Sequence, residues 1–351
     1  MVRVLLKHDL TPLCFLGEHY FIRAAGVHLP YLASRDELAA QLPATTSDDV
    51  LDAAFEEMQT ERRRRLDAGR DARERKALYA SSYTPLRADA YVLAPDQDLA
   101  PELLSAVDAV AKARQGSALP GAQRRAAAVH ATERPHGVFR LPVLAKEKCA
   151  AILEELAHFK QQAESHDWPV GRPNSMNRSG VLLSELGFAP RFLDPLVTDY
   201  VSPLVAALFP DHGGGSIDSH RSFTVSYVPK DLDPRADDSL SYHFDDAEAT
   251  LNVNLGEAGY EGGELLFGGL SDRAHGHDRR VPVPLGVGEG VLHLGCHMHE
   301  AAPLLVGRRV NLVVWLRSGA ARRQRCPMCG RGGCGFVGGP SHDDDDDARQ
   351  G

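Results

Sequence analysis

The sequence predicts an α+β fold in which a double-sheet jelly roll core, flanked by helices, follows a mainly helical N-terminal region. Two observations carry this prediction. Apolar residues recur with helical spacing in several segments before the glycine turn at residues 213–215, whereas after it they alternate with a period of two. The later segments are short and are joined by Gly- and Pro-rich turns. That pattern is typical of an antiparallel jelly roll, which can cradle a ligand between its sheets.

The first helix is predicted to begin after Ser47, whose side chain can cap it, with Asp48 and Asp49 as acids of the first turn. Its far end carries four consecutive arginines, Arg62–Arg65. Because acidic residues surround this run, we interpret it as a solvated helix face rather than as a nucleic-acid site.

The remaining elements follow in chain order. Helices are predicted over Leu99–Arg114, over a stretch that begins near Cys149 and over about Asp194–Leu208, with an Ala/Gly/Arg-rich linker at 115–131 and a short strand at 141–144. Strands are predicted at Ser222–Val228, Thr250–Leu255, Gly263–Phe267, Val281–Leu285, Val291–Leu294 and Val310–Leu316. We therefore expect four regions: a mainly helical N-terminal region (1–140), a helical support (141–215), the jelly roll (216–320) and a Cys-containing, acidic tail (321–351).

Composition is that of a soluble globular protein. The chain has 351 residues, is 43% hydrophobic and carries a net charge of −9, which argues against nucleic acid as a partner. No run approaches the roughly 18 apolar residues of a membrane-spanning helix, and early charges argue against a signal peptide. Six clustered cysteines do not suit a disulfide framework, so we expect an intracellular protein of the cytoplasm or nucleus. No feature of the sequence defines an oligomeric state.

A metal site is predicted around His243 and Asp245, which lie two residues apart in a segment that reads as extended, so both side chains point to one face. A second imidazole must come from elsewhere. His293, His297 and His299 are candidates of one parity if their strand is regular, and spacing does not choose among them. Two histidines and one carboxylate on one face of an ion are typical of non-haem Fe(II) oxygenases, where a co-substrate and O2 fill the open positions.

Arg309 is the next candidate, because it precedes the apolar run Asn311–Leu316, which is long enough to be a buried strand. A buried arginine needs a partner, and a bidentate pair with a carboxylate is its usual one. A dicarboxylate that chelates iron at one end would present its other carboxylate to Arg309.

In motif and order, the sequence resembles the prolyl 4-hydroxylase-like branch of the 2-oxoglutarate- and Fe(II)-dependent oxygenases. That family has His-x-Asp, a distal histidine and a basic residue ten positions later, and only His299 has a basic residue, Arg309, at this distance. The resemblance implies His243, Asp245 and His299 as iron ligands and Arg309 as the anchor of 2-oxoglutarate, on a double-stranded β-helix. It is densest from Pro142 to Cys329.

The resemblance also implies an activity. Oxidative decarboxylation of 2-oxoglutarate with O2 would give succinate and CO2 and hydroxylate a C–H bond. By analogy with prolyl and lysyl hydroxylases, we expect a protein or peptide side chain as substrate and ascorbate as reductant. Tyr227 lies where the family often has a tyrosine near the co-substrate, and Thr250 and Asn252, on the polar face of their strand, could also touch it. Arg172 and Asn177 are candidates for the substrate side.

Two other functional classes stay open. A catalytically inactive jelly-roll binding module would not need to keep both the ligand set and Arg309. A metal-dependent hydrolase would use such a triad to activate water, but it has no need of a buried carboxylate clamp. Arg309 therefore separates the oxygenase from the hydrolase.

The end of the chain carries two further features. Cys326, Cys329 and Cys334, with His342, could bind zinc or could remain reduced thiols. Residues 343–347 are five consecutive aspartates, which we expect to lie in a disordered tail.

Overall fold

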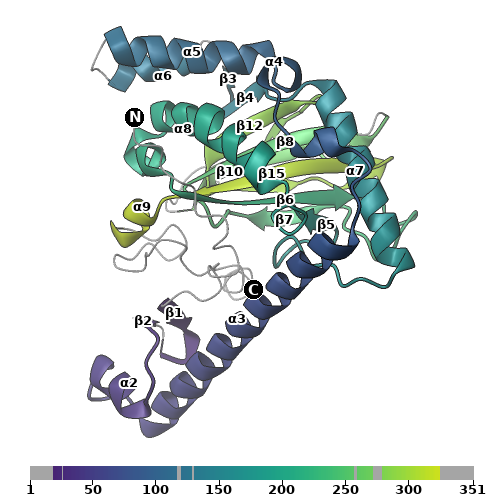
Figure 1. The fold of residues 1–351 in the computed structure, drawn as a ribbon. Helices are drawn as coiled ribbons and strands as arrows, with labels where there is room; N and C mark the ends of the chain where they lie inside the picture. Colours follow the sequence, from purple (N-terminus) through teal and green to yellow (C-terminus); the bar gives the residue numbers. More distant parts are fainter. Residues whose placement is uncertain are drawn as a thin grey trace.

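The computed structural model describes residues 19–25, 27–116, 120–128, 130–256, 259–271 and 279–324. In this part of the chain the strands form antiparallel sheets, with helices packed on one side of the larger sheet (Figure 1). The α+β fold class is therefore confirmed. The tail predicted to begin at residue 321 is wrong for residues 321–324, which form the end of the helix Gly319–Gln324. The rest of it, with Cys326 to the aspartate run, lies outside the described residues.

Most strands belong to two sheets. The larger has the order β3 (Thr132–Glu133), β4 (Val138–Pro142), β12 (Glu289–Leu294), β8 (Ala249–Gly256), β15 (Arg309–Arg317), β6 (Ser219–Tyr227), β5 (Gly180–Leu182). The smaller has the order β11 (Val281–Val283), β10 (Leu265–Leu270), β13 (His297–Ala301), β7 (Leu240–His243). Two short pairs complete the set: β1 (His19–Ile22) with β2 (Val27–Pro30), and β9 (Glu261–Gly262) with β14 (Leu304–Val306).

Helices account for the rest of the regular structure. The α-helices are α2 (Arg35–Gln41), α3 (Asp48–Ser82), α4 (Pro95–Asp98), α5 (Pro101–Gly116), α6 (Pro120–Ala128), α7 (Lys146–Ser165), α8 (Ser202–Leu208) and α9 (Gly319–Gln324). The predicted linker at 115–131 is wrong for the residues that form α6. The four-region division stays a prediction, and β4 crosses its boundary at residue 140.

The helix predicted over 194–208 is only partly an α-helix. Residues Ala189–Leu193 and Leu196–Val201 form wider π-helical turns before α8 begins. Pro190, Pro195 and Pro203 each lack a backbone N–H, which removes donors that a regular α-helix would use. The wider turns are therefore a local consequence of proline spacing.

The N-terminal helix α3 is capped as predicted, since the Ser47 hydroxyl accepts a hydrogen bond from the Val50 N–H at 3.4 Å. Its C-terminal end lies beside the sheets, and β1, β2 and α2 lie against its N-terminal half (Figure 1). Its arginine run is not wholly solvated, because Arg65 is buried with its guanidinium 4.2 Å from the centre of the Tyr20 ring. Arg65 also pairs with Glu61 at 2.6 Å.

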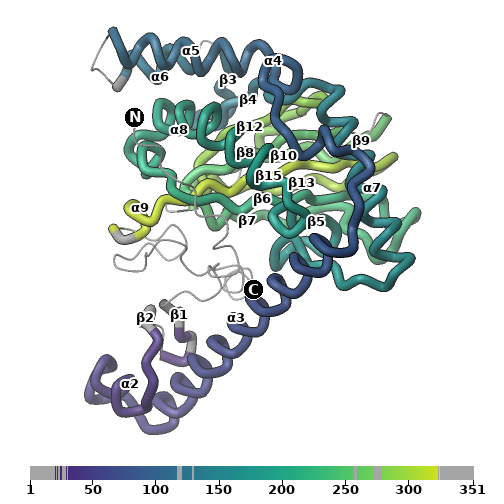
Figure 2. Tube along the Cα trace, viewed as in Figure 1, coloured from purple at the N-terminus to yellow at the C-terminus, as the bar shows by residue number. Residues whose placement is uncertain are grey.

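Two apolar cores sandwich the larger sheet. Leu251, Val253 and Leu255 of β8 belong to the core shared with α5, α7 and α8, which lie over one face of that sheet (Figure 2). The second core lies between the two sheets and includes Phe223, Phe267 and other residues. The predicted alternation along β8 is confirmed, because Asn252 instead lines a cavity between the sheets.

No described helix is both long enough and apolar enough to cross a membrane.

Candidate metal centre

His243, Asp245 and His299 converge at one end of the space between the two sheets. β7 ends at His243 and pairs with β13 so that His243 lies opposite His299, with ring centres 4.3 Å apart. Asp245 follows β7 and is held by a hydrogen bond from its N–H to the Gly295 carbonyl at 2.9 Å. One nitrogen of each imidazole and one carboxylate oxygen all lie within 4.8 Å of one another, so this group could hold a metal ion.

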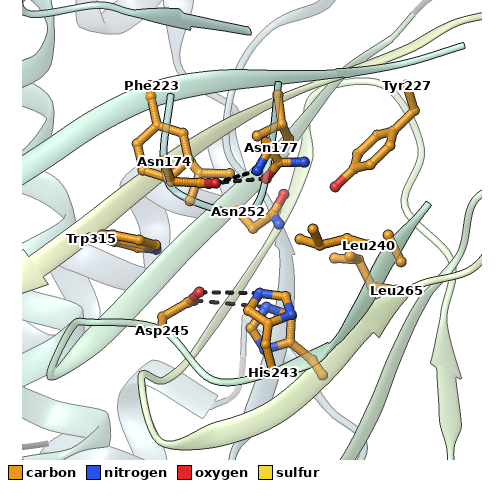
Figure 3. A pocket seen from close by; sticks show the side chains of 14 residues that line it. Asn174, Asn177, Phe223, Tyr227, Leu240, His243, Asp245, Asn252, Leu265 and Trp315 are labelled. Atoms are coloured by element: carbon orange, nitrogen blue, oxygen red, sulfur yellow. Dashed lines mark hydrogen bonds and ion pairs between the residues drawn. The ribbon is translucent and has the colours of Figure 1, made fainter. Parts of the chain in front are cut away.

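Both imidazoles present Nε2 to the Asp245 carboxylate, and Figure 3 shows this carboxylate beside His243. His243 Nε2 lies 3.6 Å from Asp245 Oδ1, and His299 Nε2 lies 3.8 Å from Oδ2. The Nδ1 atoms face backbone carbonyls, of Ser241 at 2.7 Å and of His297 at 2.9 Å. Because a carbonyl only accepts, each Nδ1 carries the proton and each Nε2 keeps its lone pair for a cation.

The charge states suit a divalent ion. Burial, together with the neighbouring His243, holds the pKa of His299 well below its ordinary value, which favours the neutral imidazole. Burial alone would raise the pKa of Asp245, but the imidazoles of His299 and His243 outweigh it and keep that pKa below its usual range. The Thr250 hydroxyl also donates to Asp245 Oδ2 at 2.6 Å. One carboxylate and two imidazoles form a donor set that fits Fe(II).

The other two candidate histidines are placed differently. β12 and β13 are separate strands of different sheets, so the parity expected for a single strand does not extend from His293 to His299. The turn between them has no room for a side chain at Gly295, where a Cβ would lie 1.7 Å from the Ala247 carbonyl oxygen. His297 Nε2 bonds to the Gly268 carbonyl at 3.0 Å, and His293 Nε2 lies 3.9 Å from Asp245 Oδ2. Only His299 of the three joins the group within 4.8 Å in the described chain.

A cavity of about 30 Å³ opens beside the three residues. Besides the three candidate ligands, its lining includes three other predicted site residues, Asn177, Tyr227 and Asn252. Burial raises the pKa of Tyr227 to about 12, so its hydroxyl keeps its proton. The lining of this cavity also includes Asn174, Phe223 and Trp315, which the sequence did not identify as site residues.

Three predicted site residues, Thr250, Arg172 and Arg309, are not part of this lining. Thr250 bonds to Asp245 and is not part of the lining. Arg172 is exposed, and its guanidinium donates to the backbone carbonyls of Ser175 and Asn177. Arg172 therefore holds the loop that carries Asn177.

Arg309, the first residue of β15, is buried at 3% exposure, and burial lowers its pKa. Its Nε donates to Asn311 Oδ1 at 2.9 Å, and Asn311 Nδ2 donates to Asn252 Oδ1 at 2.5 Å. Within the described chain, no carboxylate lies at ion-pair distance from its guanidinium. Sequence reasoning did not give Asn311 a role, although it is the one polar residue within the apolar run that follows Arg309.

The guanidinium of Arg309 faces a second, larger cavity. This cavity has a volume of about 310 Å³ and is lined by Arg309, Tyr260, Leu285 and others. Leu265 lines both cavities. The ring centre of Tyr227, in the smaller cavity, lies 5.6 Å from the Arg309 guanidinium carbon, so the two cavities are neighbours.

Comparison with known proteins places this geometry in a family. A family model described as an OGFOD2-like domain matches residues 79–214. A mouse protein, 2-oxoglutarate and iron-dependent oxygenase domain-containing protein 2, is 40% identical over 326 residues, which cover 90% of this chain and 88% of the mouse protein. The chain belongs to this family. The human protein of the same name is also 40% identical, over 93% of this chain and 90% of its own length.

The solved structures that resemble the chain are more distant. A prolyl-4-hydroxylase from Pseudomonas putida is 17% identical and has a TM-score of 0.36, covering 53% of this chain and 95% of that one. The close relatives confirm the predicted family, and they confirm the prediction that the protein is an oxidoreductase. The hydrolase alternative is therefore set aside.

Proposed function

We propose that the protein is an Fe(II)- and 2-oxoglutarate-dependent dioxygenase whose iron is held by His243, Asp245 and His299. The observation that carries this proposal is the convergence of two imidazoles and one carboxylate within 4.8 Å. Bound iron would supply the activation of O2, with 2-oxoglutarate as co-substrate and succinate and CO2 as products. We assign the two facing sheets to a double-stranded β-helix.

The residues around the triad would bind and orient the co-substrate. Arg309 is a buried cation whose side-chain partner is the neutral Asn311, so it can receive a carboxylate. Asn252 connects the triad with Arg309, because it lines the cavity at the triad and bonds to Asn311, the partner of Arg309. A dicarboxylate that reaches from the triad to Arg309 would pass Leu265 and Tyr227.

Thr250 would serve the metal rather than the co-substrate. Its hydroxyl donates to Asp245 Oδ2, which would hold the carboxylate with Oδ1 near His243 Nε2, where a metal ion can bind both atoms. Partners of this kind fix the orientation of a ligand and are typical of metal centres.

For the second substrate we propose a protein or peptide side chain, supported by the motif resemblance to prolyl and lysyl hydroxylases. Asn177 and Asn174 come from a loop on one wall of the cavity, where they would meet an entering group. Arg172 would keep that loop in place through its bonds to backbone carbonyls. Ascorbate is the proposed reductant on the same resemblance.

The direct test is succinate formation by the protein supplied with Fe(II), 2-oxoglutarate and O2. We expect turnover that stops in Asp245→Ala and continues in a variant of the exposed Arg178. Peptides containing proline or lysine that increase the rate, and that gain one oxygen atom by mass spectrometry, would identify the substrate class. Equal succinate yields from the parent and Asp245→Ala would contradict the proposed site.

A further inference from the structure

Four buried charged residues lie directly behind the candidate iron ligands. We call them the buried ion cluster: Asp246, Glu248, Arg317 and Arg322, which are 1%, 8%, 2% and 3% exposed. The two acids sit in the loop that follows Asp245, whereas the arginines come from the end of β15 and from α9. The partners are more than 70 residues apart in sequence, so only the fold brings them together.

Asp246 is held from both sides. Arg317 Nη2 lies 2.5 Å from its Oδ2 and Arg322 Nη1 lies 2.7 Å from its Oδ1. Arg317 Nε also donates to the backbone carbonyl of Asp246 at 2.9 Å. The carboxylate and the peptide group next to Asp245 are therefore both fixed.

Glu248 closes the other end of the loop. Arg322 Nε donates to Glu248 Oε1 at 3.0 Å, and the Ser318 N–H donates to Oε2 at 2.5 Å. The Glu248 carbonyl accepts from the Gly295 N–H at 3.1 Å, and the Gly295 carbonyl accepts from the Asp245 N–H at 2.9 Å. A continuous set of hydrogen bonds thus runs from Arg322 to the backbone of Asp245.

A stable core does not require this arrangement. Taking ionised groups out of water is costly, and apolar residues of similar volume often give equal or greater stability at such positions. The charged groups instead fix geometry. A guanidinium sets both the distance and the orientation of the carboxylate that it binds.

We propose that Arg317 and Arg322 are positioning residues of the metal centre, an inference that rests on the iron site of the proposed function. Acting through Asp246 and Glu248, they hold residues 245–248 so that the Asp245 carboxylate faces Nε2 of both His243 and His299. The short helix α9, at the end of the described chain, is on this account a part of the iron site.

A purely structural role gives a different expectation. If the cluster only anchors α9 to the sheet, its loss lowers stability and leaves the metal affinity of the folded protein unchanged. Metal affinity measured on folded protein therefore separates the two roles.

The test is anaerobic titration of the full-length protein with Co(II), followed by its absorption bands and by competition with a chelator. We expect Arg322→Met to bind Co(II) about 10–100-fold more weakly than the parent, the range typical for loss of a residue that orients a ligand. Arg322→Lys keeps the charge and should recover part of the affinity and the parent's band shape.

A matched control comes from another arginine–glutamate pair, whose side chains are 16% and 8% exposed. Arg75 of α3 donates two hydrogen bonds to Glu185, of 2.8 and 2.7 Å, in the segment that follows β5. Arg75→Met should lose stability and bind Co(II) as the parent does. If Arg322→Met does not fold, the double variant Glu248→Leu/Arg322→Met removes the pair without leaving a lone charge and takes its place.

The outcomes are distinct. A parent that binds no Co(II) overturns the proposed iron site itself. A parent that binds Co(II), with folded Arg322→Met or the double variant binding within twofold of it, overturns only the positioning role. Weaker binding in those variants but not in Arg75→Met supports it.

Discussion

The two ends of β15 carry the same residue type in opposite situations. Arg309 begins the strand and Arg317 ends it, and both are almost fully buried. Arg317 is paired with Asp246 at 2.5 Å, whereas Arg309 meets only the neutral side chain of Asn311 at ion-pair range in the described structure. Burial therefore does not distinguish a structural charge from one that awaits a ligand, but the presence of a counter-charge does.

The role assigned to Arg309 requires a metal at His243, Asp245 and His299. The largest expected effect is therefore on Fe(II) binding by these three residues. His243→Ala, Asp245→Ala and His299→Ala should each abolish stoichiometric Fe(II) binding, because each removes one of three protein ligands. His297→Ala should keep the iron, since His297 bonds to the Gly268 carbonyl instead. Iron content after anaerobic loading and desalting measures this, with circular dichroism as the check on folding. Loss of iron in His297→Ala but not in His299→Ala would move the ligand.

The second prediction separates the two arginines by stability. Arg317→Met removes one of the two arginines that pair with Asp246, and Arg322 remains. It should lower the free energy of unfolding by about 3–5 kcal/mol. Arg309→Met removes a buried cation that forms no ion pair in the described residues and should leave the free energy of unfolding unchanged or raise it. Urea unfolding of metal-free protein measures both. Equal losses in the two variants would break the comparison.

The third prediction supplies Arg309 with an internal partner. In Asn311→Asp the new carboxylate would pair with the Arg309 guanidinium, which now contacts Asn311 at 2.9 Å, and compete with the co-substrate. We expect 2-oxoglutarate affinity to fall by about 1.5–3 kcal/mol, the range for a hydrogen bond to a charged group. Asn311→Ala adds no competing charge and should lose less. Isothermal titration of the Co(II)-loaded variants compares them, and tighter binding in Asn311→Asp would exclude Arg309 as the anchor.

The sequence alone contained much of this site. The two-residue spacing of His243 and Asp245 and the position of Arg309 at the start of an apolar run led to residues that the fold places around neighbouring cavities. These signals are local, so periodicity could detect them. The choice of His299 came from family resemblance, because the turn at Gly295 that splits β12 from β13 has no signature in the spacing of the histidines.

The remaining features depend on distant contacts. Nothing near Arg317 in sequence marks Asp246 as its partner, since β15 must pair with β8 before they meet. The sequence predicts a linker where α6 lies, because its Ala, Gly and Arg residues show little apolar periodicity, yet α6 packs against α5 and α8. Tertiary packing decided both cases, against the local sequence signal.

The smallest expected effect concerns Cys149, which lies away from both ends of β15. It is a residue of α7 whose side chain is buried in the core, and burial raises its thiol pKa to about 12. Its thiolate is therefore absent at neutral pH, and we expect no alkylation in the native protein. Peptide mapping after iodoacetamide treatment, with and without urea, measures this. Rapid native labelling would show that the α7 core opens.

The central claim is that Arg309 waits for the distal carboxylate of 2-oxoglutarate while the triad holds the metal. Its most direct test is titration of 2-oxoglutarate into the anaerobic Fe(II) protein, followed by the charge-transfer absorption of the chelate. Arg309→Met should weaken binding by about 3–5 kcal/mol, or two to four orders of magnitude, with iron affinity unchanged, and Arg309→Lys should lie between it and the parent. Binding of 2-oxoglutarate by Arg309→Met as tight as by the parent would contradict the account.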